Sequence, residues 1–96
     1  MKESTLVKGV LDELNGMPEC KAVKFHGSRF TEAGTPDIVG CFRGIPFLIE
    51  CKVGRNEPTK IQAHRMRQWA DAGAFVTVAR EDFDVPAFIE SLSEHS

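Results

Sequence analysis

The sequence of 96 residues is poor in cysteine and has no long hydrophobic run. Its three cysteines are an odd number without C-x-x-C spacing, which argues against a disulfide framework and against a four-ligand zinc site. No apolar run approaches the roughly 18 to 20 residues that span a bilayer. Residues 1–14 mix acidic and basic groups, unlike a signal peptide. We therefore expect a reduced, cytoplasmic protein with no membrane partner.

The chain also lacks an excess of charge of one sign, because 12 Lys and Arg residues meet 14 Asp and Glu residues. The net charge of -2 nevertheless hides an asymmetry along the chain. Residues 52–67 contain five cations and one anion, whereas residues 81–96 contain five anions and no Lys or Arg. The first segment suits a polyanion and the second repels one. On charge alone, two ordinary solvated faces of opposite sign explain the pattern equally well.

Length and composition predict a single domain over residues 1–96. Hydrophobic residues make up 42% of the chain and charged residues 27%, which is far from the composition of a disordered segment. A chain of this size has a small core, so a deep cleft is easier to build between two subunits than within one. We therefore expect an oligomer.

Hydrophobic periodicity and the positions of Gly and Pro divide the chain into seven short elements. Apolar residues at three- and four-residue steps predict a first helix that ends near Asn15 and Gly16. β-rich runs cover residues 21–26, 37–42, 45–53 and 75–78, and two further helices are expected at 58–73 and 85–92. The order αβββαβα predicts an α/β (mixed α+β) fold in which helices flank a mixed β-sheet. Met66 and Trp69, on the apolar side of their helix, are expected in the core.

The second and third β-rich runs are separated by Arg43 and Gly44, which predicts a hairpin. With a two-residue turn there, positions whose numbers sum to 87 lie opposite each other across the strand pair. Asp37 then faces Glu50, and Lys52, two residues further on, shares that face.

Two opposed carboxylates destabilise a strand pair unless a cation lies between them. Hard oxygen ligands such as Asp37 and Glu50 suit Mg²⁺ or Mn²⁺. Lys52 beside them could hold the attacking water or stabilise charge on a phosphate, which describes metal-assisted hydrolysis. Taken singly, Pro36-Asp37 also reads as a simple turn, and Glu50 with Lys52 as the charge alternation that protects a sheet edge.

Pro36-Asp37, twelve intervening residues and then Glu50-Cys51-Lys52 resemble the PD-(D/E)XK nuclease signature. The flanking sequence resembles the VRR-NUC branch in three places, namely Gly-Thr-Pro-Asp-Ile at 34–38, Gln62, and Val-Thr-Val-Ala-Arg at 76–80. The resemblance covers about residues 3–80. It implies a restriction-endonuclease-like core and a small stand-alone member of the phage type, acting in bacterial or phage-infected cytoplasm.

The resemblance also assigns roles to individual residues. It implies catalytic residues Asp37, Glu50, Lys52 and Gln62, and metal ligands Asp37, Glu50, the backbone carbonyl of Cys51, and Glu3. Two positions have other readings. Gln62 also completes a Thr59-x-x-Gln62 capping box, and Arg80 stands where the closing strand departs from the family pattern by lacking a second arginine.

Cations near the proposed site are the candidates for contacts with the DNA backbone. These are Arg55, Lys60, Arg65 and Arg67, with Ser28 and Arg29 in a Gly-containing loop as further candidates. The same loop also reads as an ordinary solvated connection.

The sequence thus favours a Mg²⁺- or Mn²⁺-dependent endodeoxyribonuclease that cuts branched DNA. From the family resemblance more than from the residues, we expect a homodimer that resolves four-way (Holliday) junctions, whose two-fold symmetry such a protein matches. The alternatives are a flap or nicking nuclease, a nuclease subunit or binding module that retains the fold without catalysis, and a plain structural domain.

Overall fold

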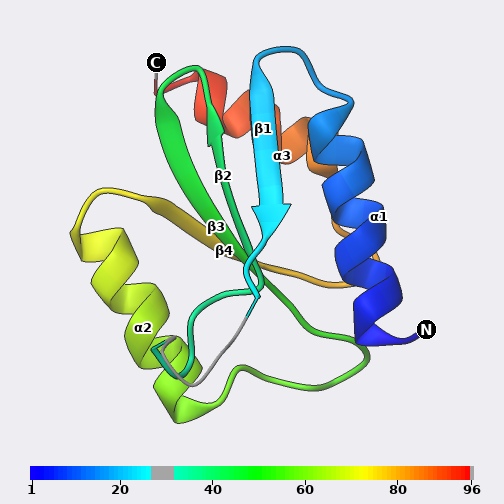
Figure 1. Cartoon of the computed structure of the whole chain (residues 1–96), viewed down its shortest axis with the longest axis vertical. Helices are drawn as coiled ribbons and strands as arrows, with labels where there is room; N and C mark the ends of the chain where they lie inside the picture. The colour runs from blue at the N-terminus through cyan, green and yellow to red at the C-terminus, as the bar shows by residue number, and fades with distance from the viewer. Residues whose placement is uncertain (27–31, 96) are drawn as a thin grey trace.

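The computed structural model describes residues 1–26 and 32–95, in which three helices accompany one four-stranded sheet (Figure 1). The elements in chain order are α1 (Glu3–Asn15), β1 (Cys20–Lys24), β2 (Ile38–Phe42), β3 (Ile45–Cys51), α2 (Lys60–Asp71), β4 (Phe75–Ala79) and α3 (Val85–Ser93). The predicted order αβββαβα is confirmed. None of the described helices is long and apolar enough to cross a membrane.

The sheet is mixed, as predicted, with its strands in the order β1-β2-β3-β4. Strand β2 pairs antiparallel with β1 and β3, whereas β4 runs parallel to β3. The β2–β3 register runs from Phe42 opposite Ile45 to Ile38 opposite Ile49, so the predicted hairpin register is confirmed.

The hairpin turn is formed by Arg43 and Gly44, both with positive φ angles (50° and 82°). Positive φ at both central residues is typical of the type I′ turn, whose twist matches that of the flanking strands. Arginine rarely adopts this conformation. The Arg43 side chain makes an ion pair with Glu19, with Nε and Oε2 2.9 Å apart, which ties the turn to the start of β1.

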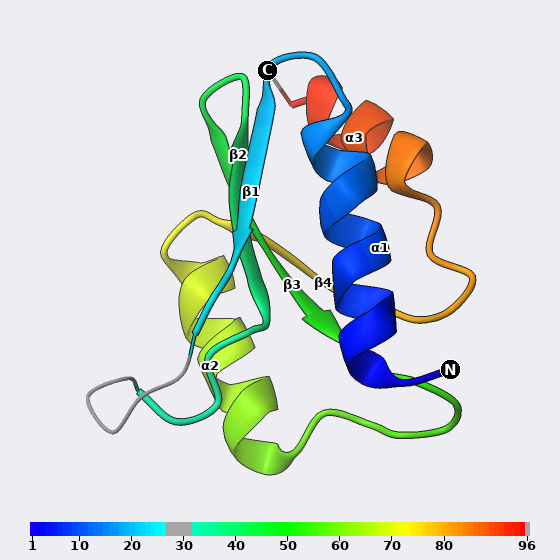
Figure 2. The same cartoon turned by 45° about the vertical axis from the view of Figure 1, so that its right-hand side comes forward.

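One face of the sheet, which we call the core face, is covered by α1 and α3 (Figure 2). Apolar side chains at alternate positions of β2 and β3 pack against α1 and α3 on this face. Burial of the apolar sides of the two helices stabilises their packing on the sheet. The buried residues are Leu6, Val7, Val10, Leu14, Ala22, Ile38, Phe42, Phe47, Ile49, Cys51, Ala79, Val85, Ile89 and Leu92. The Phe47 ring lies directly over Gly40, where an added Cβ would come within 2.4 Å of the ring.

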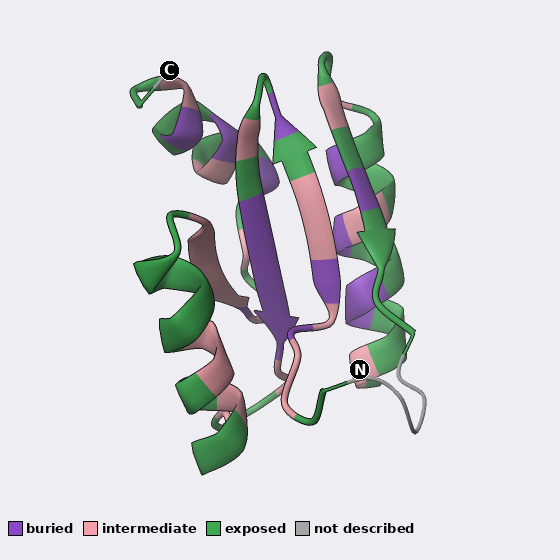
Figure 3. Cartoon of the chain, turned by 60° about the vertical axis from the view of Figure 1, so that its left-hand side comes forward, coloured by how far each residue is buried: buried purple, intermediate pink, exposed green. Residues whose placement is uncertain are grey.

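The opposite face, which we call the site face, carries α2 beside β4 (Figure 2). No residue of α2 is buried (Figure 3). The prediction that Trp69 belongs to the core is therefore wrong: this side chain is 40% exposed, while Met66 is half-buried. The reason is the position of the helix, because β4 is an edge strand and α2 beside it keeps much of its surface in water.

The outer edge of β1 is closed by a side chain. Asn15, the last residue of α1, donates from Nδ2 to the carbonyl of Ala22 and accepts from its amide, both at 2.9 Å. The amide group thus satisfies the strand backbone as a neighbouring strand would. This contact fixes α1 against β1 and blunts an edge that could otherwise pair with another chain.

Candidate active site

Asp37 and Glu50 meet at the end of the β2–β3 pair. One step beyond the last pair, Ile38 and Ile49, the register brings Asp37 opposite Glu50. The Asp37 side chain accepts a hydrogen bond from the backbone N–H of Cys51 (Oδ2 to N, 2.8 Å), and its backbone carbonyl accepts one from Phe25 at 2.7 Å. Both its backbone and its side chain are therefore held.

Glu50 is the one buried charged residue among those that the structure describes, at 1% exposure. Its Oε2 atom is buried and has no hydrogen-bond partner in the described part of the chain. Burial raises the pKa of Glu50 to about 8, with a hydrogen bond and the negative charge of Asp37 acting in the same direction. The nearby Lys52 ammonium lowers this pKa, and Glu3 adds a smaller upward effect. Asp37, Lys52 and Glu3 therefore all act electrostatically on Glu50.

These residues fit a hard divalent cation. An orphaned carboxylate oxygen in a buried position is costly unless a proton or a cation satisfies it. Among the described residues, no group of three or more His, Cys, Asp or Glu side chains could hold an ion alone. A pair of carboxylates matches Mg²⁺, which is usually bound through one or two carboxylates and keeps several waters. The predicted ligand role of Glu3 stays a prediction.

The Cys51 side chain does not offer a soft ligand. It lies in the hydrophobic core, and burial raises the pKa of its thiol to about 12, with further upward effects from Asp37, Glu50 and Glu3. A metal-binding thiolate requires the opposite shift. Only the backbone carbonyl of Cys51 remains as the predicted ligand from this residue.

The segment that leads into Asp37 is fastened to α2. Gly34 has a φ of +83°, and an added Cβ there would lie 2.8 Å from the carbonyl oxygen of Ile61. Arg65 donates from Nε to the carbonyl of Ala33 at 3.0 Å and pairs with Glu32 at 3.1 Å. Glycine is required because both the backbone angle and the close approach exclude a larger residue. This contact explains the glycine at 34 in physical terms.

Arg65 was predicted to contact a DNA phosphate, yet its guanidinium is already engaged. Besides Ala33 and Glu32 it donates to the side chain of Gln68 at 3.0 Å, and its side chain is only 20% exposed. The phosphate contact stays a prediction. Removing this arginine would also loosen the segment that carries Asp37.

Gln62 and Thr59 form the capping box that the spacing indicated. The Thr59 hydroxyl accepts from the Gln62 amide at 3.2 Å, and the Gln62 side chain accepts from the Thr59 amide at 2.9 Å. The side-chain oxygen of Gln62 thus stabilises the start of α2. A catalytic role for Gln62 remains a prediction.

Lys52 follows β3 and is tied to β4 through its backbone amide, which donates to the carbonyl of Ala79 at 3.0 Å. The turn after it, residues 53–57, is bound by two residues whose roles the sequence did not reveal. Arg80 donates to two carbonyls of this turn, and Glu81 accepts from its Gly54 amide. Neither residue carries a local pattern, because the contacts join positions more than 20 apart in the chain.

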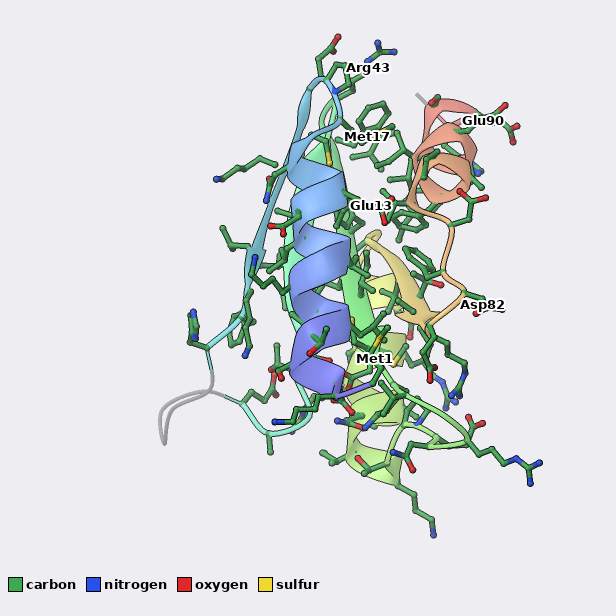
Figure 4. All side chains as sticks on the ribbon, turned by 90° about the vertical axis from the view of Figure 1, so that its right-hand side faces the viewer. Met1, Glu13, Met17, Arg43, Asp82 and Glu90 are labelled. Atoms are coloured by element: carbon green, nitrogen blue, oxygen red, sulfur yellow. The ribbon has the colours of Figure 1, made fainter. Side chains whose placement is uncertain are left out.

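The charge asymmetry of the sequence is in part a separation in space, although Glu81 of the acidic segment binds the Gly54 amide beside Arg55. The cations Lys60 and Arg67 are exposed on α2, and Arg55 is exposed in the turn after Lys52. The acidic residues Asp82 and Glu90 lie at α3 and the segment before it, away from α2 (Figure 4). Ser28 and Arg29 lie outside the described residues.

Comparisons with known proteins bear on the fold. No family model and no curated protein matches the sequence. A solved structure named "VRR_NUC domain" aligns with 97% of this chain and 95% of its own, with a TM-score of 0.70 and 22% sequence identity. This chain has the VRR_NUC fold. A second structure, a "VRR_NUC domain protein", covers 98% of this chain and 87% of its own, with a TM-score of 0.67 and 17% identity.

The chain is also similar in fold to a solved resolvase. Hjc, a Holliday junction resolvase from the archaeal hyperthermophile Archaeoglobus fulgidus, aligns with 83% of this chain and 70% of its own, at a TM-score of 0.62 and 17% identity. The predicted resemblance and the restriction-endonuclease-like α/β fold are confirmed at the level of the fold.

Proposed function

We propose that this protein is a metal-dependent endonuclease that hydrolyses phosphodiester bonds in DNA. The observation that carries the proposal is the buried Glu50 carboxylate, whose Oε2 has no partner in the described residues and which meets Asp37 across the strand pair. A protein gains nothing in stability from such a pair unless a proton or a cation completes it, and a bound cation is the form that supports chemistry on a phosphodiester. Asp37, Glu50 and the Cys51 carbonyl would hold Mg²⁺ or Mn²⁺.

The roles of the chain's own residues follow from their positions. Asp37 is oriented by the Cys51 amide, and Glu50 is held in a buried strand, so both carboxylates are preorganised. The Lys52 ammonium is close enough to lower the pKa of Glu50 and can donate hydrogen bonds to a phosphate oxygen or to the attacking water. When bound, a divalent ion supplies Lewis acidity and lowers the pKa of a water ligand.

For the substrate we propose branched DNA, with a four-way junction cut by a homodimer. Two observations support this choice: the fold is shared with the resolvase Hjc, and a chain of 96 residues has one Asp37–Glu50 pair. Symmetric cleavage of two strands needs two such sites, which a two-fold dimer supplies. The exposed cations Arg55, Lys60 and Arg67 are the candidates for contacts with the DNA backbone.

The test is cleavage by the purified protein of labelled junctions, flaps, nicked duplexes and intact duplexes, with Mg²⁺, Mn²⁺ or EDTA. We expect metal-dependent cutting that is fastest on junctions, and loss of cutting in Asp37→Asn with DNA affinity largely retained. Asp82→Asn, an exposed change on the α3 side, is the matched control and should cut normally. Sedimentation would measure the proposed dimer.

Other results would point to the alternatives. Cutting that favours flaps or nicks would replace the junction as substrate while keeping the nuclease. DNA binding without cutting under every metal condition would indicate a non-catalytic module, and neither binding nor cutting would indicate a structural domain.

A further inference from the structure

The chain that follows Lys52 leaves the sheet at once. Strand β3 ends at Cys51, and the Lys52 amide makes the last hydrogen bond to β4, at Ala79. Residues 53–57 then form a turn in which the Asn56 amide donates to the Val53 carbonyl at 3.2 Å. One such bond is a weak restraint for the segment next to a catalytic lysine.

Two adjacent residues at the end of β4 supply the missing restraint. Arg80 donates from Nη1 to the carbonyls of Gly54 (3.1 Å) and Asn56 (2.8 Å), and from Nη2 to the Glu57 carboxylate (3.0 Å). Both carboxylate oxygens of Glu81 accept from the Gly54 amide, at 3.0 and 3.1 Å. We call this pair the Arg80–Glu81 clamp.

The contacts of the clamp indicate different roles for Arg80 and Arg55. The Arg80 guanidinium is satisfied by two carbonyls and a carboxylate, so it is poorly suited to a phosphate. The carbonyls that it holds belong to Gly54 and Asn56, the two neighbours of Arg55. The clamp therefore fixes the backbone on both sides of Arg55, whose side chain is exposed.

We propose that Arg80 is a positioning residue, which holds the turn after β3 so that Lys52 and Arg55 keep a fixed relation to the Asp37–Glu50 pair. This inference rests on the proposed nuclease function. The guanidinium binds two carbonyls through Nη1 and the Glu57 carboxylate through Nη2, whereas a lysine ammonium has all its donors on one nitrogen and lacks this planar fork. Displacement of a reacting group by about 1 Å can cost about 10²-fold in rate, so a loosened turn has a measurable effect.

The test compares Arg80→Met and Arg80→Lys with Arg43→Met, the matched control. Arg43 also makes an exposed ion pair, but at the hairpin tip (Figure 4), which lies at the opposite end of β2 from Asp37. With Mg²⁺ saturating and below each unfolding midpoint, we expect kcat to fall about 10-fold or more in Arg80→Met. Arg80→Lys should recover only part of the kcat that is lost in Arg80→Met. In both variants, the Mg²⁺ concentration that gives the half-maximal rate should equal that of wild type. The control should keep the wild-type kcat.

A kcat of Arg80→Met within threefold of wild type would overturn the proposal, as would an equal loss in the control. If Arg80→Met does not fold, Arg80→Lys takes its place, and a wild-type kcat in the folded lysine variant would overturn the proposal. If Arg80 were only structural, its replacement would lower the melting temperature but leave kcat unchanged at temperatures well below that melting temperature.

A second measurement does not depend on activity. Hydrogen–deuterium exchange should be faster at residues 52–57 in Arg80→Met than in wild type, and unchanged at residues 38–45. Unchanged exchange at 52–57 would show that the clamp does not hold the turn. If wild-type protein cuts no DNA, the proposed function fails, and the exchange result still decides whether Arg80 restrains this segment.

Discussion

The two faces of the sheet are built differently. On the core face, α1 and α3 enclose apolar side chains such as Phe47 and Ile49, which are fully buried. On the site face, α2 contributes no buried residue, and β3 carries Glu50, whose Oε2 has no hydrogen-bond partner in the described residues. The stabilising burial is concentrated on one face, which leaves the other free to carry an unfavourable polar group.

The largest expected effect tests the core face. Phe47→Ala removes a fully buried ring that packs over Gly40 and edge-to-face against Phe88, with ring centroids 5.5 Å apart. Loss of a buried phenylalanine costs about 3–5 kcal/mol, because a cavity remains. Urea unfolding followed by circular dichroism should show this loss of unfolding free energy. A loss under about 1 kcal/mol would mean that the core face does not dominate stability.

The next effect belongs to the site face and concerns activity alone. Lys52→Ala should lower the rate of DNA cleavage by about 10²-fold or more, because one charge stabiliser of the transition state is lost. Its unfolding free energy should stay within about 0.5 kcal/mol of wild type, since this side chain is partly exposed and outside the hydrophobic core. Single-turnover cleavage with urea unfolding measures both quantities. Wild-type cleavage by Lys52→Ala would remove the lysine from the proposed mechanism.

Glu50→Gln should change how stability depends on pH. The carboxyl pKa is about 4.5 in the unfolded chain and about 8 in the folded protein, so unfolding releases a proton between these values. In EDTA, the wild-type free energy of unfolding should therefore fall as pH rises from 4.5 to 8 and level off above. Glutamine has no proton to release, so the variant should show a flatter profile and greater stability at pH 8.

Added magnesium should also distinguish wild type from Glu50→Gln. At pH 8, added MgCl₂ should raise the melting temperature of wild-type protein, because a cation that binds only the folded state stabilises it. Glu50→Gln should show little of this effect, and Glu90→Gln, an exposed change on α3, should behave as wild type in both experiments. Equal pH profiles in Glu50→Gln and wild type would contradict the buried, proton-holding state of Glu50.

The sequence carried enough information for the strands and the carboxylate pair. A two-residue turn fixes a hairpin register, and the register alone brings Asp37 opposite Glu50. The sequence could not reveal the roles of Arg65 and Arg80. Each binds backbone carbonyls of a distant segment, and any residue type supplies a carbonyl. Such contacts leave no pattern in the sequence except the glycine at 34, which marks a close approach.

The smallest expected effect comes from Trp69, where sequence reasoning was wrong. An amphipathic pattern shows which side of a helix is apolar, but it does not show whether that side meets the centre of a sheet or its edge. Because Trp69 is 40% exposed, Trp69→Ala should lower the unfolding free energy by only about 1–2 kcal/mol, well below the cost at Phe47. Urea unfolding of both variants in one buffer measures the two losses of unfolding free energy, so that they can be compared directly. Equal losses at Trp69 and Phe47 would show that α2 is packed as tightly as the core face, and the contrast between the two faces would then have to be abandoned.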